Sequence, residues 1–381
     1  IFLVSHMFTA NTRSPYYQNL RQTIQSLGGM DNAHLHLDRA GTYEDHYFSE
    51  ANLTLDQNNH ISLHKKHALI AKVHSGPAYE TEDLEMRVRS VLDTMIELGT
   101  RRADTMVDVT ADRVGLSALR TLNRVKSDYL GRIELNNASY TPLGFSDAHP
   151  AMWETFEEGV AEADFIGALP EADDIVDYPD HIGFIEHCRR VLELARKHNK
   201  MIHIHTDQRN DPRETGTEQV IEAVKQFGAP DSEDGEPKVW VIHMVSPSTY
   251  DEARFEKLAQ GLVEQNIGVI CCPSAAVGMR QLRPLETPSY NCIPRVLELL
   301  TAGVRVKIAS DNIADICSPS TTADLIDELF VLSAAIRFYH VDILAHLAAG
   351  KPPTDAHLAL IKDHLAQNNN EIQRVIDHYN G

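Results

Sequence analysis

Several features that mark membrane, secreted or nucleic-acid-binding proteins are missing from this sequence. No stretch reaches the roughly 18 uninterrupted apolar residues of a membrane-spanning helix, so we expect no membrane partner. The 35 basic residues are outnumbered by 55 acidic ones, the formal net charge is −20, and no block rich in lysine or arginine occurs. Because nucleic-acid binding requires basic side chains that neutralise phosphates, a small-molecule partner is the better expectation.

Cysteine is also scarce. The five cysteines include no Cys-x-x-Cys pair, which argues against a disulfide framework and against a cysteine-rich zinc site. We therefore expect a reducing, cytoplasmic location. Ser5-His6-Met7 is typical of an expression-tag remnant, so residues 1–7 are interpreted as such a remnant, with Met7 as the expected native start.

Short apolar or β-branched runs recur along the chain, and most are followed by a segment with helical periodicity, as in repeated βα units. That periodicity is clearest at 116–125, 185–198, 250–265 and 293–301. The eight runs expected to be strands are 30–37, 103–109, 132–135, 165–169, 201–205, 239–243, 268–272 and 304–308. Eight βα units predict an α/β fold, the TIM (β/α)8 barrel.

The segments outside these units are interpreted as elaborations of one domain that spans 1–381. The gap from 39 to about 102 is too long for an ordinary connection, so we expect an elaborated loop and helices over the mouth of the barrel. It contains His60, His64 and His67, which could form a metal site or simply a solvated helix face. Extra C-terminal helices are expected at 321–338, 341–349 and 354–379, with no separate small β domain.

Polar residues at the predicted strand ends indicate a metal site. In His34-Leu35-His36 the two rings point the same way if the segment is a strand, but with 20 histidines about one such pair is expected by chance. The pair gains weight because TIM-barrel enzymes place functional groups at the carboxyl ends of their strands. The later strands end with His205, Asp207, His243, Asp311 and Asn312.

Three neutral imidazoles and one carboxylate would hold a divalent ion and leave a position for water, whose pKa the ion lowers towards neutrality. A single histidine at such a position is better explained as a hydrogen-bonded core residue, whereas the whole set favours a metal. His203 is an alternative ligand because it shares a strand face with His205, one step deeper in the barrel.

In these motifs the sequence resembles the amidohydrolase superfamily and, within it, the cytosine-deaminase-like group. The similarity runs from Gly28 to about Pro319. It is carried by Asn32-Ala33-His34-Leu35-His36-Leu37-Asp38, Gly167-Ala168-Leu169-Pro170, Ile204-His205-Thr206-Asp207, Ile242-His243 and Ser310-Asp311-Asn312.

The resemblance implies a set of roles. His34, His36, His205 and Asp311 are the implied ligands of one metal ion, and His243 is implied to hydrogen-bond the attacking hydroxide or the developing oxyanion. Many relatives bridge two metals through a carboxylated lysine, but no lysine ends the third or fourth predicted strand. We therefore expect a single divalent ion, zinc first, with iron or manganese as alternatives.

The chain departs from cytosine deaminases at the residue that transfers protons. Those enzymes have a glutamate three residues after the strand-five histidine, where this chain has Gln208. An amide can position a substrate but cannot exchange a proton in the same way. Asp311 could do all the proton transfer, Asp207 could turn inward, or Glu171 after strand four could reach the substrate; we favour Asp311 as the sole base. Glu171 could equally be a solvated loop carboxylate.

The expected pocket also differs. Where cytosine deaminases use a glutamine to read the pyrimidine, this chain has Leu143 within Pro142-Leu143-Gly144, so cytosine itself is not the expected substrate. Arg39 could clamp a carboxylate or ring carbonyl, or form a salt bridge with Asp38 or Glu44. The full set of expected substrate-binding residues is Arg39, Leu143, Glu171, Asp207 and Asn312.

The sequence therefore predicts a metal-dependent hydrolase that cleaves a C–N bond in a small, cyclic nitrogenous compound. Opening of a cyclic amide or removal of a substituted amine competes with simple deamination, because Gln208 replaces the usual proton shuttle. The alternative is a catalytically silent barrel that binds a metal or ligand. A homo-oligomer is a possible assembly.

Overall fold

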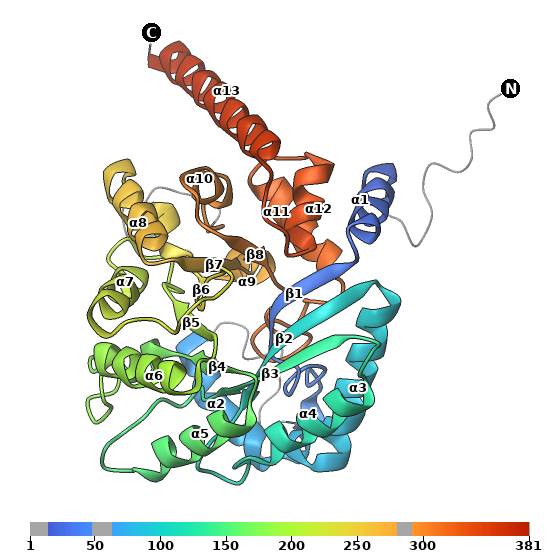
Figure 1. Cartoon of the computed structure of the whole chain (residues 1–381), viewed down its shortest axis with the longest axis vertical. Coiled ribbons are helices and arrows are strands. Elements are labelled where there is room, and N and C mark those ends of the chain that lie inside the picture. Colours follow the sequence, from blue (N-terminus) through green and yellow to red (C-terminus); the bar gives the residue numbers. More distant parts are fainter. Residues whose placement is uncertain (1–13, 48–62, 280–291, 381) are drawn as a thin grey trace, which may run out of the picture.

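The computed structural model describes residues 14–47, 63–279 and 292–380. Eight parallel strands form one sheet in which each strand pairs with the next along the chain (Figure 1). The strands are β1 (Met30–Leu35), β2 (Thr100–Asp108), β3 (Glu134–Tyr140), β4 (Phe165–Ala168), β5 (Ile202–Thr206), β6 (Val239–His243), β7 (Ile267–Cys271) and β8 (Val306–Ile308). The predicted TIM (β/α)8 barrel is confirmed.

Helices surround the sheet (Figure 1). They are α1 (Pro15–Ser26), α2 (Leu63–Ser75), α3 (Thr81–Glu97), α4 (Ser117–Asp128), α5 (Ala151–Glu162), α6 (Phe184–His198), α7 (Gly216–Phe227), α8 (Glu252–Glu264), α9 (Pro273–Gly278), α10 (Val296–Ala302), α11 (Leu325–Ala335), α12 (Val341–Ala348) and α13 (Asp355–Asn380). Helix α6 illustrates how they pack, because Cys188, Val191, Leu192 and Ala195 recur at helical spacing and are all buried.

The elaborations around the barrel follow the sequence-based expectation. Helices α2 and α3 occupy the long gap after β1, and α11 to α13 follow β8, with α13 extending away from the barrel (Figure 1). Helix α1 precedes β1 and packs against α12, a contact that the sequence did not indicate. Within the described ranges, every helix is too short or too polar to cross a membrane.

Strands β1 and β8 close the barrel through one asparagine. The side chain of Asn32 donates to Ser310 Oγ at 2.9 Å and accepts from the backbone N–H of Ser310 at 3.0 Å. The next backbone N–H, that of Asp311, donates to the carbonyl of His34 at 3.0 Å. Closure of the barrel therefore brings Asp311, which follows the last strand β8, next to His34 in the first strand β1.

The predicted end of the third strand, residue 135, was wrong. β3 continues to Tyr140, because polar and small side chains in its second half are buried and hydrogen-bonded. Asn137 donates to Asn123 Oδ1 at 2.9 Å, and Ser139 donates to the carbonyl of Phe156 at 3.2 Å. Apolar periodicity cannot detect a strand segment whose buried side chains are polar and donate hydrogen bonds to neighbouring segments.

Candidate metal centre and active-site cavity

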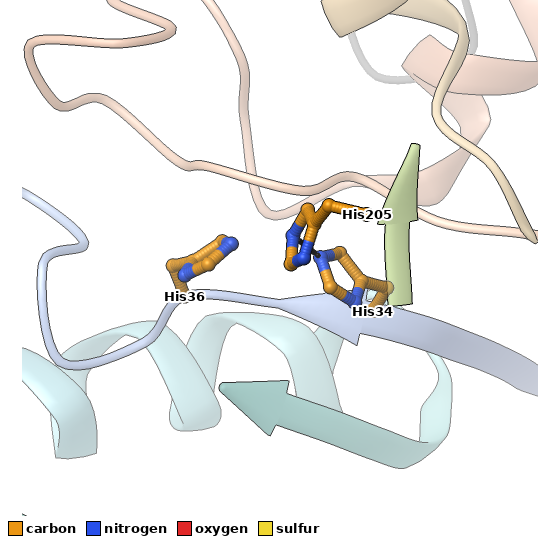
Figure 2. Close-up of side chains that lie close together, drawn as sticks. All are labelled: His34, His36 and His205. Carbon is orange, nitrogen blue, oxygen red and sulfur yellow. Dashed lines mark hydrogen bonds between the residues drawn. The ribbon is translucent and has the colours of Figure 1, made fainter. Parts of the chain in front are cut away.

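Three histidine rings face one another where β1 and β5 end (Figure 2). Nε2 of His34 lies 3.1 Å from Nε2 of His205, and the ligand atoms of His34, His36 and His205 all lie within 4.8 Å of one another. Asp311 Oδ1 lies 3.3 Å from Nε2 of His36 and 3.7 Å from Nε2 of His34. Donor atoms about 2.1 Å from a tetrahedral ion are about 3.4 Å apart. The three imidazoles therefore lie close enough to share one ion, and Asp311 has ligand spacing to His36 and His34.

Strand alternation and local backbone strain aim these side chains inward. In β5, Ile202 and Ile204 pack into the outer core, which leaves His203 and His205 facing the barrel interior. His243 ends β6 two residues after the outward-packed Val241, so strand alternation alone would point its side chain outward. Its left-handed backbone (φ 74°) breaks that alternation. Its ring lies 5.4 Å from the ring of His205. Such strained residues concentrate at functional sites.

The histidine rings are neutral, as metal ligands must be. Burial lowers the pKa of His205 to about 3, and it lowers the pKa values of His34 and His36 well below their usual range. Nδ1–H of His205 donates to the carbonyl of Ala168 at 2.9 Å, which leaves the Nε2 lone pair for a metal. His203 lies behind His34, with their Nδ1 atoms 3.4 Å apart, so it supports that ring from the second layer.

His36 and Arg39 form a contact that bears on metal binding. A guanidinium can only donate, so Nδ1 of His36 accepts from Arg39 at 2.5 Å and the proton of the neutral ring lies on Nε2. A metal on Nε2 requires the other tautomer, and Arg39 must then withdraw from Nδ1. His205 thus has the tautomer that a metal on Nε2 requires, and His36 acquires it by a shift of the Arg39 side chain.

Arg39 is held by a buried charged network rather than by either partner that the sequence suggested. Its guanidinium lies 3.3 Å from Asp108, which also accepts from Tyr79 at 2.7 Å and lies 3.0 Å from His74. Burial opposes ionisation of Asp108, but Arg39 and His74 outweigh it and hold its pKa well below the usual range. Burial also disfavours charged His74, yet Asp108 and Asp112 raise its pKa to about 9.

A cavity of about 530 Å³ opens above the histidine cluster, a size typical of small-molecule sites. Eight of the eleven residues that the sequence assigned to metal binding, catalysis or substrate binding line its wall. Those in the wall are His36, Arg39, Glu171, His205, Gln208, His243, Asp311 and Asn312. His34 is fully buried beneath them.

Asp207 and Leu143 are not among the residues that line this cavity. Asp207 turns away, and its two carboxylate oxygens accept from the backbone N–H groups of Gly216 and Thr217 at 2.7 and 2.8 Å. Its role is therefore to hold the start of α7. In place of Leu143, the preceding Pro142 lines the cavity, so the wall is apolar there, as predicted, but through a different residue.

Gln208 is joined to Glu171 across the loops that follow two neighbouring strands. Nε2 of Gln208 donates to Glu171 Oε2 at 2.9 Å, and both residues line the cavity. Burial, reinforced by the nearby carboxylates of Glu214 and Asp207, raises the pKa of Glu171 to about 8. A carboxyl group with this pKa is protonated at neutral pH and can donate a proton.

Sequence reasoning did not assign several residues in the cavity wall. Tyr140 ends β3, and its ring lies 5.4 Å from the rings of both His36 and His205. Continuing the alternation of the third strand from Glu134 to residue 140 would have placed Tyr140 at the strand end, where site residues are expected. Lys66 and His67 reach the cavity from α2. His60 and the side chain of His64, which the sequence left open between a metal site and a solvated helix face, lie outside the described residues.

No family model matches the chain. An uncharacterized protein from Haemophilus influenzae is 27% identical over 286 residues, which cover 73% of this chain and 95% of that protein. Among solved structures, 5-methylcytosine deaminase from Klebsiella pneumoniae is similar with a TM-score of 0.69 and 20% identity, over 84% of this chain and 72% of that one. N-isopropylammelide isopropylaminohydrolase from Burkholderia multivorans is similar with a TM-score of 0.63 and 16% identity, over 84% and 73%.

These likenesses establish a shared fold. The chain shares the fold of two enzymes whose names describe a deaminase and an aminohydrolase. The histidine cluster and its cavity lie at the carboxyl ends of the strands, where TIM-barrel enzymes carry their active sites.

Proposed function

We propose that this protein is a hydrolase that uses one divalent metal ion to cleave a C–N bond of a small, cyclic nitrogenous compound. The observation that carries the proposal is the meeting of three neutral imidazoles, with the Asp311 carboxylate beside two of them, at the floor of a cavity of small-molecule size. The similarity in fold to a 5-methylcytosine deaminase and an isopropylaminohydrolase supports the same reaction class.

His34, His36, His205 and Asp311 would hold the ion. Zinc suits this set because it accepts nitrogen and carboxylate ligands in a tetrahedral arrangement, with iron and manganese as alternatives. When bound, the ion supplies a hydroxide near neutral pH by lowering the pKa of water.

Two residues of the chain supply the groups that act on the substrate. Asp311 accepts the proton of the attacking water, from a position 4.0 Å from Nε2 of His243. Burial lowers the pKa of His243 to about 4, against the opposite effect of Asp311. The neutral ring can donate one N–H to the oxygen that becomes negatively charged as the attack proceeds.

The walls of the cavity indicate the substrate class. Pro142 and Leu169 give it apolar walls, while Asn312 and Gln208 offer amide groups. Pro142 offers no side-chain donor where cytosine deaminases read the pyrimidine, which supports a substrate other than cytosine. The candidate reactions are therefore removal of a substituted amine, opening of a cyclic amide, and deamination of a ring other than cytosine.

Zinc-loaded protein should be incubated with cytosine, 5-methylcytosine, N-isopropylammelide and hydantoin, and the release of ammonia, amine or ring-opened acid measured. We expect turnover of at least one compound other than cytosine, and loss of that turnover in His205→Ala. Bound metal and ligand-induced thermal stabilisation without any turnover would instead support a binding protein.

A further inference from the structure

We propose that Glu171, oriented by Gln208, is the group that delivers a proton to the departing nitrogen. This inference rests on the proposed hydrolase function and assigns a residue to the step for which Gln208 is chemically unsuited. It also replaces the expectation that Asp311 performs all the proton transfer.

The position of Glu171 follows from strand pairing. Glu171 lies in the short 3-10 helix Pro170–Asp173 directly after β4, and Gln208 lies two residues after β5. Because β4 and β5 are paired neighbours, the two side chains meet above the same barrel edge as His205. Gln208 donates to Oε2 of Glu171 at 2.9 Å. Among the described residues no side chain or backbone group hydrogen-bonds to Oε1, so this oxygen can contact a substrate.

The charges around Glu171 favour a protonated carboxyl group. Glu214 and Asp207 oppose its ionisation, and Arg209 is the nearby cation that favours it. Arg209 is itself engaged elsewhere, since it donates to Asp177 at 2.7 Å and lies 3.6 Å from Glu214. Burial and the two carboxylates therefore prevail, and the pKa of Glu171 rises to about 8.

The competing candidate, Asp207, is excluded by its contacts. Both of its oxygens accept from backbone N–H groups at the start of α7, and it is fully buried outside the cavity wall. Turning it inward would leave Gly216 and Thr217 with unpaired N–H groups, which is costly in a buried position.

The proposed step balances as follows. The oxygen of water bonds to the ring carbon while one of its protons passes to Asp311. The C–N bond then breaks, its electron pair goes to nitrogen, and nitrogen takes the proton of the Glu171 carboxyl group. The proton on Asp311 finally moves to ionised Glu171 through water in the cavity, so one water is consumed and both residues return to their starting forms.

The first test exchanges the two side chains in the zinc-loaded protein. Glu171→Gln should lower kcat by about 100-fold or more, the contribution expected of a general acid. The kcat is measured on the panel compound that the wild type turns over. The double variant Glu171→Gln/Gln208→Glu restores one carboxyl group to the pair and should recover kcat to within about tenfold. Glu222→Gln, on the exposed face of α7, is the matched control and should retain wild-type turnover.

A second measurement does not depend on turnover. Carbon-13 NMR of zinc-loaded protein with labelled glutamate carboxyl groups, compared with Glu171→Gln, identifies the Glu171 signal. We expect it to titrate near pH 8. Titration at an ordinary carboxyl pKa, near 4.5, overturns the proposal, as does unchanged kcat in Glu171→Gln or a swap variant that fails to regain kcat. If no panel compound is turned over, the proposed function fails, and the titration still decides the state of Glu171.

Discussion

Replacement of Asp207 should destabilise the fold far more than it affects the chemistry of the cavity. Asp207 follows β5 in a left-handed conformation (φ 58°), and its carboxylate oxygens bind the N–H groups of Gly216 and Thr217 at the start of α7. Its own carbonyl accepts from Val245 and Ser246 at 3.1 and 3.0 Å. One residue thus joins β5, α7 and the segment after β6.

The magnitude follows from the two side-chain contacts. A hydrogen bond to a charged group contributes about 1.5 to 3 kcal/mol, so the pair contributes about 3 to 6 kcal/mol before the cost of burying the carboxylate is subtracted. Asp207→Asn keeps the left-handed backbone, which asparagine tolerates, and retains one acceptor oxygen. We therefore expect Asp207→Asn to lower the free energy of unfolding by about 2 to 3 kcal/mol.

Urea unfolding followed by circular dichroism measures this loss, with Glu222→Gln as the control. Glu222 pairs with Lys225 on the exposed face of the same helix, and loss of such a pair costs less than about 1 kcal/mol. Asp207→Asn should unfold at a clearly lower urea concentration. Its kcat at low temperature should fall much less than that of Glu171→Gln, because burial and Glu214 still raise the pKa of Glu171 when the Asp207 charge is removed. An unchanged midpoint with a large fall in kcat would place Asp207 in the catalytic machinery and refute the reasoning.

Three further predictions concern the buried network, the metal and the assembly. Because the pKa of His74 is raised to about 9 in the fold, against about 6.5 in an unfolded chain, its stabilisation is fully present below pH 6.5 and is lost as pH rises to 9. It amounts to about 3 kcal/mol, so the urea midpoint should fall over that range in the wild type and much less in His74→Gln; equal falls in both would contradict the assignment. Plasma mass spectrometry after zinc loading and desalting should find one zinc per wild-type chain and almost none in His205→Ala, and full occupancy of the variant would argue against His205 as a ligand. If the chain is a homo-oligomer that uses the exposed apolar face of α13, where Ile372 and Ile376 are 49% and 45% exposed, Ile372→Glu/Ile376→Glu should lower the molar mass found by light scattering, and an unchanged mass would exclude that face.

Sequence reasoning predicted the barrel well because parallel strands buried on both faces leave a strong apolar pattern. The histidines and Asp311 were found because their place at strand ends is fixed by the fold itself. The second half of β3 was missed because its buried residues Asn137 and Ser139 are polar and donate hydrogen bonds to neighbouring segments, and Tyr140 was missed with it.

Contacts between distant segments could not be predicted in the same way. The partner of Arg39 is Asp108 rather than the nearby Asp38 or Glu44, because the guanidinium crosses from β1 to the end of β2. The direction of Asp207 depends on where α7 begins, and the pairing of Glu171 with Gln208 depends on two loops that are 37 residues apart. Each is decided by packing in three dimensions, which strand periodicity does not describe.

Oxygen-18 incorporation tests the central claim most directly. Zinc-loaded protein would be incubated in ¹⁸O-labelled water with 5-methylcytosine, N-isopropylammelide and hydantoin, and the products examined by mass spectrometry, beside chelator-treated protein and His205→Ala. We predict one labelled oxygen at the carbon that has lost nitrogen, in the zinc-loaded wild type and in neither control. Absence of labelled product from every compound, or equal labelling after metal removal, would contradict a metal-dependent hydrolase.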